Sequence, residues 1–189
     1  MTVYRIVAAT LAVVGFTSAM VVAQTMVPPS SGTASKTDEL LHVPAADYRR
    51  DWIQLGIFSI QADEPGEGAK SLHVVYAEPE AVDVWRRTGS FPHGATLVKD
   101  VLNTETEALT TGLVSYAGEL AGRFVMVKDA KGEFEGSSPL WGDGWGWAFY
   151  TSTETRVTDT TNYRADCLSC HEPVRASDLL YIQRHAGRN

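Results

Sequence analysis

The two cysteines of the chain lie together near its end, in the stretch DCLSCHE at residues 166–172. Cys167 and Cys170 are two residues apart, and His171 follows directly, which gives the pattern C-x-x-C-H. Two thiols at this spacing can form thioethers with the vinyl groups along one edge of a porphyrin, and the adjacent imidazole reaches the iron. The motif therefore predicts one covalently attached haem c with His171 as an axial ligand of the iron.

Other chemistries of a cysteine pair fit the chain less well. A thioredoxin-like dithiol normally follows an early strand in a βαβ unit, whereas this motif lies 19 residues from the end of the sequence. A structural zinc site usually has four ligands, and no second cysteine pair is present. The remaining histidines are scattered along the chain: His42, His73, His93 and His185. A disulfide between Cys167 and Cys170 would close a very small loop and stabilise the fold little.

The position of the motif also bears on the sixth ligand of the iron. Small electron-transfer cytochromes carry a methionine ligand after the motif, but Met126 is the last methionine of this chain. Met126, His73 and His93 stay open as alternatives for a sixth ligand. The pattern favours an open distal position, where a small molecule can bind iron.

The beginning of the chain has the layout of an export signal. Arg5 precedes an apolar run of 18 residues, 6–23, which ends in small residues at Val21-Val22-Ala23. This order is typical of a signal peptide cleaved after Ala23, although a run of this length could also serve as an uncleaved membrane anchor. Residues 1–23 are therefore interpreted as a signal peptide and the protein as periplasmic.

Composition then divides the remainder of the chain. Residues 24–46 are rich in proline, serine, threonine and alanine without a sustained period, which predicts a flexible linker. Residues 47–189 have the size of a single domain with its own core. The formal net charge is −7, so a nucleic-acid partner is not expected, and a redox partner with a basic patch suits the chain better.

Hydrophobic patterns predict several short strands and one internal helix. The helix runs from Pro79 to Gly89, with proline in its first turn and glycine at its end. A second short helix is expected over residues 176–188. Strands are expected at residues 52–60, 72–77, 95–102, 113–128 and 144–151. This order predicts an α+β domain that is mainly an antiparallel β-sheet, with a few short helices and a C-terminal haem-attachment segment.

One charged residue interrupts the apolar face of a predicted strand. In ATLVKDVL, Lys99 shares a face with Ala95, Leu97 and Val101. Lysine is rarely buried without a partner, so either this face is partly exposed, with the ammonium group reaching its rim, or Lys99 has a special role.

A second strand pattern runs through residues 113–126. Period-2 alternation places Gly118, Gly122 and Phe124 on an apolar face, and Glu119 and Arg123 on the opposite face. Glycines on such a face indicate either close approach of a ligand or another backbone, or ordinary core packing.

Together these motifs resemble the cytochrome P-460 family over roughly residues 48–185. The resemblance rests on LHVVYAEPEAVDVWRRTGSFPHGATLVKDVL, on the aromatic strand GWGWAFY, and on the late ADCLSCH. It implies a mainly antiparallel β fold, often a homodimer, that holds one c-type haem with an open distal side. In hydroxylamine-oxidising members a lysine is covalently cross-linked to the porphyrin, and the V-K motif of the family places that lysine at Lys99.

The resemblance also implies a function. Such a site would oxidise hydroxylamine or bind and convert nitric oxide, so the expected substrate or ligand is a small nitrogen compound. The electrons would pass to a soluble acceptor such as another c-type cytochrome. The position of the family's distal glutamate, which accepts protons in the oxidation, falls near Phe124 in this chain. The sequence departs from the family there, and this departure weakens the catalytic interpretation. The related cytochromes c′-β share the fold but have phenylalanine-capped pockets that bind nitric oxide or carbon monoxide, and Phe124 with Phe58 would suit that behaviour. The alternatives to catalysis are therefore gas binding and simple electron transfer.

Overall fold

The computed structural model describes residues 35–151 and 153–182, all within one compact unit, Thr33–Asn189. The predicted signal peptide, residues 1–23, lies outside the described residues. Among the described residues, no helix has the length and apolar composition needed to cross a membrane.

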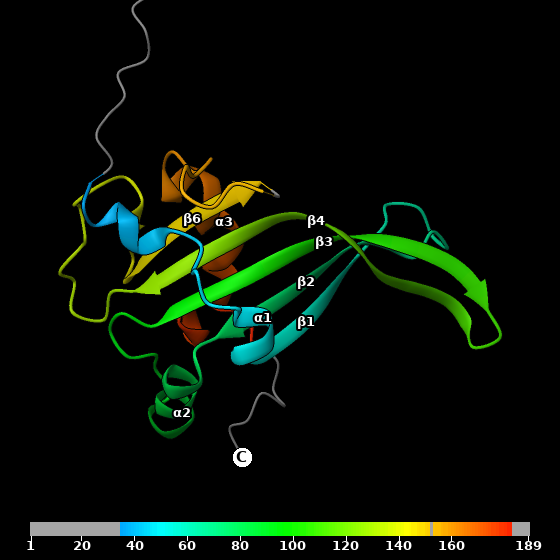
Figure 1. Ribbon diagram of the computed structural model, residues 1–189, viewed down its shortest axis with the longest axis horizontal. Coiled ribbons are helices and arrows are strands. Elements are labelled where there is room, and N and C mark those ends of the chain that lie inside the picture. The colour runs from blue at the N-terminus through cyan, green and yellow to red at the C-terminus, as the bar shows by residue number, and fades with distance from the viewer. Residues whose placement is uncertain (1–34, 152, 183–189) are drawn as a thin grey trace, which may run out of the picture. The chain divides into compact units, whose positions relative to one another are not determined.

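The unit is built on one six-stranded sheet in the order β1-β2-β3-β4-β6-β5, and each pair of neighbours is antiparallel (Figure 1). The strands are β1 (Ile53–Gln61), β2 (Ala69–Ala77), β3 (Thr96–Leu109), β4 (Gly112–Lys128), β5 (Trp141–Gly142) and β6 (Trp145–Thr151). The expected α+β class with a mainly antiparallel sheet is confirmed, and β3 is longer than its predicted span.

The register of the central strands brings two residues of the predicted site together. Lys99 on β3 is paired with Val75 on β2 and with Phe124 on β4. Side chains of directly paired residues project from the same face of a sheet. Lys99, the charged residue on the otherwise apolar face of residues 95–101, therefore stands beside the phenylalanine rather than beside an acidic residue.

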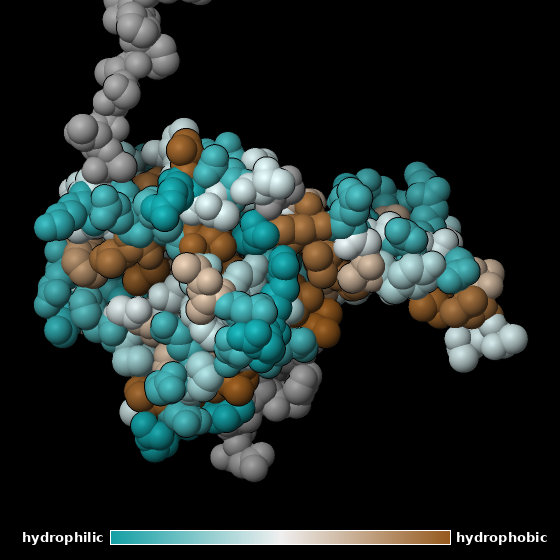
Figure 2. Space-filling view, in the orientation of Figure 1, coloured by the Kyte–Doolittle hydropathy of each residue, from teal (hydrophilic) through white to brown (hydrophobic). Residues whose placement is uncertain are grey.

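The far ends of β3 and β4 extend beyond the other strands as a hairpin (Figure 1). Leu109 and Leu113 near its turn are exposed, and Figure 2 shows apolar surface at the tip of this arm. The continuous even-numbered face expected for residues 113–126 is interrupted, because Val101 pairs with Gly122 whereas Leu102 pairs with Leu120. The extra residue Ala121 forms a bulge, and a second register shift follows between Leu102 and Thr104, so the alternation of faces along β4 is broken twice.

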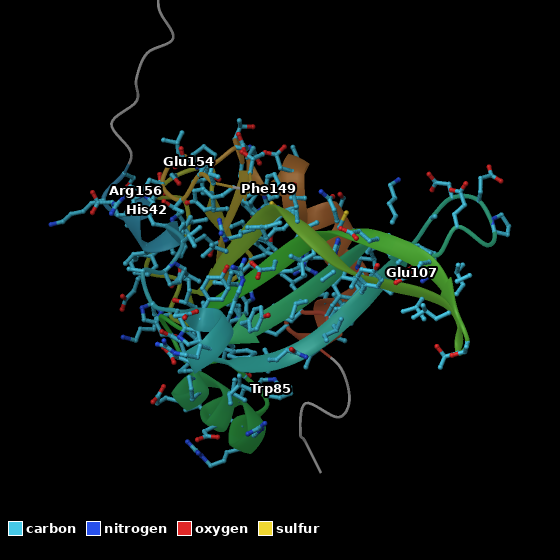
Figure 3. The ribbon with its side chains drawn as sticks, turned by 45° about the vertical axis from the view of Figure 1, so that its right-hand side comes forward. His42, Trp85, Glu107, Phe149, Glu154 and Arg156 are labelled. Atoms are coloured by element: carbon cyan, nitrogen blue, oxygen red, sulfur yellow. The ribbon has the colours of Figure 1, made fainter. Side chains whose placement is uncertain are left out.

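The predicted helix is present as α2 (Pro79–Thr88). Gly89 ends it with a φ of 86°, a left-handed conformation that glycine adopts without a steric cost. Val82 is fully buried, and Trp85, labelled in Figure 3, stacks on Phe91 with ring centroids 5.7 Å apart. The helix thus closes one end of the core.

Different segments cover the two faces of the sheet (Figure 1). On one face, the short helices η1 (Asp38–Leu41) and α1 (Tyr48–Asp51) pack over a cluster that contains Val98 and Val125. Leu41 has no exposed surface, and its carbonyl accepts a hydrogen bond of 2.9 Å from Tyr150. The last part of residues 24–46, the stretch expected to be a linker, therefore packs on the sheet.

The C-terminal segment covers the opposite face. It comprises a π-helical turn, η2 (Arg164–Leu168), then α3 (Ser169–His171) and the 3-10 helix η3 (Glu172–Ser177). The prediction of a helix from residue 176 onward is wrong for residues 178–182, which are not helical. Asp178 and Leu179 have φ values of 60° and 63°, which end the helical path. The chain turns there because Leu179 and Leu180, 2% and 5% exposed, are buried in the core.

Candidate haem-binding site

A cavity of about 500 Å³ lies against the face of the sheet that the C-terminal segment covers. Its walls include every residue that the sequence singled out as a site residue: Phe58, Lys99, Phe124, Cys167, Cys170 and His171. Its lining is mostly apolar, and its volume falls within the usual range of ligand-binding pockets.

The two cysteines reach the cavity from consecutive helical turns. Cys167, in η2, is buried, whereas Cys170, in α3, is exposed, and neither forms a disulfide. Burial raises the pKa of the Cys167 thiol to about 11. A redox dithiol needs a stabilised thiolate, so this environment does not support one. No group of three or more potential metal-ligating side chains occurs among the described residues.

His171 is held by a backbone hydrogen bond. Its Nδ1 lies 2.6 Å from the carbonyl oxygen of Leu179, and a carbonyl can only accept, so Nδ1 carries the hydrogen. This tautomer leaves the lone pair of Nε2 free for a metal. Trp147 packs against the ring with centroids 4.9 Å apart at 78°, and Tyr181 does so at 5.8 Å and 70°.

Burial lowers the pKa of His171 below its ordinary value, and the charge of Lys99 lowers it further, while the hydrogen bond to Leu179 opposes both effects. The imidazole is therefore neutral at pH 7, as a metal ligand must be.

Lys99 projects into the cavity and does not reach a carboxylate. Its Nζ lies 4.1 Å from the ring centroid of Phe124, and within the described part of the chain no acidic group lies within 4.0 Å of it. Burial lowers the pKa of Lys99, although the nearby Cys170 and Cys167 act in the opposite direction. A buried lysine with a lowered pKa has a larger fraction of neutral, nucleophilic amine at neutral pH.

Aromatic rings form the wall around Lys99. Phe124 packs against Phe149 with ring centroids 4.5 Å apart, and Phe149, labelled in Figure 3, lies in the packed part of the sheet. Phe58 packs edge-on against Tyr181 at 6.4 Å. Arg123 lies on the opposite face, as expected, where it donates to the hydroxyl of Tyr48.

The sequence interpretation considered His73 as a sixth ligand and named no proton acceptor for this cavity, but the structure offers His73 for that role as well. His73 lies on β2 and lines the cavity, with its Nε2 3.2 Å from Ser71 Oγ. Burial lowers its pKa, and so does the charge of Lys99, so the imidazole is neutral at pH 7. The sequence signal for a basic group here is a histidine within the otherwise apolar strand LHVVYA.

The other acidic or coordinating residues are less suited to a role in the cavity. Asp166 lines it, but one carboxylate oxygen, Oδ2, already accepts from the backbone nitrogens of Thr161 and Asn162, which lower its pKa. Among the three residues considered as a sixth ligand, Met126 and His73 line the cavity. His93 instead lies beside Asp129 and is not part of the lining.

These residues fit a c-type haem. Two thiols lie on adjacent helical turns at the edge of an apolar cavity, beside an imidazole whose Nδ1 is fixed and whose Nε2 is free. The family model described as Cytochrome P460 matches residues 45–182 of the chain. A comparison with curated proteins finds no match. The matched range contains the whole sheet and every residue of the cavity named above.

Proposed function

Since the chain belongs to the cytochrome P460 family, a family of haem-binding c-type cytochromes, we propose that it carries one haem and oxidises hydroxylamine. The haem is attached through Cys167 and Cys170, and His171 supplies the axial nitrogen. Nitric oxide, a product or ligand of the same chemistry, binds at the same iron.

The observation that carries this proposal is the position of Lys99. Its amine lies in the cavity that also receives both cysteines and His171, it is desolvated, and no acidic partner among the described residues holds it. A lysine in such a place is costly unless its charge is removed. We propose that Lys99 is bonded to the porphyrin, as in the hydroxylamine-oxidising members of the family.

The proposed bond joins Lys99 Nζ to a carbon of the ring and replaces one N–H and one C–H bond. Two protons and two electrons leave, so an external oxidant such as a peroxide must accept the electrons. The product is a neutral amine, which removes the cost of burying the ammonium group.

When bound, the haem supplies an iron centre that accepts electrons from the nitrogen compound. Conversion of hydroxylamine to nitric oxide also releases three protons with the three electrons. His73 is the group that we propose as acceptor of these protons, because its imidazole is neutral and faces the cavity. Phe124 and Trp147 keep the cavity apolar and limit the access of water.

The electrons then pass to a soluble acceptor such as another c-type cytochrome. We also propose that the protein is exported to the periplasm after cleavage at Ala23, because attachment of c-type haem in bacteria takes place outside the cytoplasm. A homodimer is expected from the resemblance to the family.

Turnover of hydroxylamine by the purified holoprotein, with a chemical oxidant as electron acceptor, tests the catalytic proposal. We expect oxidant-dependent consumption of hydroxylamine by the wild type and a loss of activity in Lys99→Met, which keeps an apolar chain of similar length. Lys70→Met is the matched control, because Lys70 pairs with Asp63 on the surface. A wild-type holoprotein that does not consume hydroxylamine would refute the catalytic proposal.

A second function is favoured by the aromatic wall. Phe124 and Phe58 line an apolar cavity in which the acidic residue, Asp166, is already hydrogen-bonded. Such a cavity suits reversible binding of nitric oxide or carbon monoxide without turnover, as in the cytochromes c′-β. Rapid binding of carbon monoxide by the ferrous protein, together with no hydroxylamine oxidation, would establish this alternative. A ferrous haem that does not bind carbon monoxide would instead indicate a simple electron carrier.

A further inference from the structure

A partly buried ion pair joins the sheet to the segment that follows the haem-attachment motif. Lys128, the last residue of β4, places its Nζ 2.7 Å from Oδ1 of Asp178, and the two side chains are 9% and 30% exposed. The same Nζ lies 4.5 Å from the ring centroid of Trp145. Burying two charges is costly, so a pair in this place indicates a local requirement for a fixed geometry.

The backbone at this point has an unusual conformation. Asp178 and Leu179 are consecutive residues with positive φ, and neither is glycine. Such conformations persist where the surrounding contacts impose them, and they cluster at functional sites. Two backbone hydrogen bonds of 3.1 Å close the turn onto η3, from Asp178 N to the Arg175 carbonyl and from Leu179 N to the Val174 carbonyl. The contacts outside η3 include the ion pair to Lys128, a 3.1 Å hydrogen bond from Trp145 Nε1 to the Asp178 carbonyl, and the burial of Leu179.

The turn contains the carbonyl group that accepts the hydrogen bond from His171. Leu179 follows Asp178 directly, and its oxygen accepts the 2.6 Å hydrogen bond from His171 Nδ1. A hydrogen bond at this nitrogen orients the imidazole and increases the electron donation of its other nitrogen to a metal. The path from Lys128 to His171 therefore consists of an ion pair, one constrained turn and one hydrogen bond.

We propose that Lys128, Asp178 and Trp145 are positioning residues that hold the Leu179 carbonyl against His171 and so set the strength of the axial bond to iron. The inference rests on His171 as the axial ligand, which is part of the proposed function, but not on the identity of the substrate. A holoprotein that fails to oxidise hydroxylamine would leave it intact.

Resonance Raman spectroscopy of the five-coordinate ferrous holoprotein tests the inference through the iron–histidine stretching frequency, with the reduction potential as a second measurement. Lys128→Met and Asp178→Asn remove opposite charges from the same contact. If the contact positions the carbonyl, both variants weaken the hydrogen bond, and the stretching frequency falls in both. The double variant should then fall no further than the single variants.

A purely electrostatic influence predicts a different pattern. Loss of a positive charge lowers the reduction potential and loss of a negative charge raises it, so the two variants would move it in opposite directions. Opposite shifts of the potential with an unchanged stretching frequency would overturn the proposal. Lys131→Met is the matched control, because Lys131 pairs with Glu133 on the surface, and it should leave the frequency unchanged.

Asp178→Asn and one further variant, Lys128→Arg, keep the test decisive if Lys128→Met fails to retain haem. Asn tolerates a left-handed conformation, so Asp178→Asn removes the charge without imposing a new backbone geometry. Lys128→Arg keeps the ion pair and should restore the wild-type frequency. An Arg variant that shifts the frequency as far as the Met variant does would contradict a role for the ion pair.

Discussion

Lys99 is the side chain on which the proposed function most depends. Its aliphatic chain lies in an apolar wall, its amine rests on the ring of Phe124, and the cavity around it also holds the haem-attachment motif. Sequence pattern placed it on an apolar face and left two outcomes open, a partly exposed rim or a special role. The structure places the amine inside the cavity, where burial lowers its pKa.

His73 gives a prediction at the same scale. Burial, the largest cause, keeps its pKa below the ordinary value of about 6.5. A base works when it is deprotonated, so hydroxylamine oxidation should be constant above this pKa and fall as the pH drops below it. In His73→Gln we expect this acid limb to disappear and kcat to fall by roughly 10²-fold.

The pH dependence of kcat measures this role, with Ser71→Ala as the control for the neighbouring hydroxyl. Ser71→Ala should keep the acid limb, because it leaves the imidazole in place. An acid limb that persists unchanged in His73→Gln would show that another group accepts the protons.

At the scale of elements, the sequence predicted the longer strands of the sheet and the helix of residues 79–88 well. It did not predict the position at which the alternation of faces along a strand is interrupted. The helix Pro79–Thr88 carries proline and glycine at its ends, and these residues act locally. The bulge at Ala121 could not be predicted, because it depends on the pairing of β4 with β3. The turn at Asp178 was also missed, since neither it nor Leu179 is a residue that signals a left-handed backbone as glycine does.

Gly122 on β4 makes the packing of this strand testable. A Cβ atom at this position would lie 2.7 Å from the ring of Phe149 and 2.8 Å from the Tyr150 carbonyl oxygen, so the glycine permits close aromatic packing. Gly122→Ala should therefore lower the free energy of unfolding by about 1–3 kcal/mol in chemical denaturation. Gly118→Ala is the control, because a Cβ atom at this position would lie 3.3 Å from the carbonyl oxygen of Asn103, a milder contact. An equal loss of stability in both variants would contradict this account.

At the scale of the whole folded unit, the sheet separates a haem-binding face from a structural face. The residues of the site come from β1 to β4, β6 and the C-terminal segment, so their proximity depends on strand order. The sequence motif predicted the residues that attach the haem, and the resemblance to a family predicted a role for Lys99. Neither predicted Lys128 or the hydrogen bond to His171, because those contacts join segments 50 and 8 residues apart through the tertiary fold.

The structural face contains its own buried charge. Asp100 is 1% exposed and accepts hydrogen bonds from Tyr48 at 2.8 Å and Arg49 at 2.6 Å. Asp100→Asn should lower the free energy of unfolding by roughly 1.5–3 kcal/mol, because it weakens charge-assisted bonds in a buried place. The haem absorption spectrum should not change, since Asp100 projects from the other face than Lys99.

Denaturant unfolding of the holoprotein measures the effect of Asp100→Asn. Asp63→Asn is the control, because Asp63 pairs with Lys70 in solvent, and its effect should stay within about 0.5 kcal/mol. A changed haem spectrum in Asp100→Asn would show that the two faces are not independent.

The proposed bond between Lys99 and the haem can be tested most directly by mass spectrometry of a tryptic digest of the holoprotein. Trypsin does not cut after a modified lysine, so residues 88–123 should stay in one piece, joined through the haem to residues 165–175, which contain Cys167 and Cys170. This joined species is the result that we predict. Recovery of a free peptide of residues 88–99, cut after an unmodified Lys99, would contradict it.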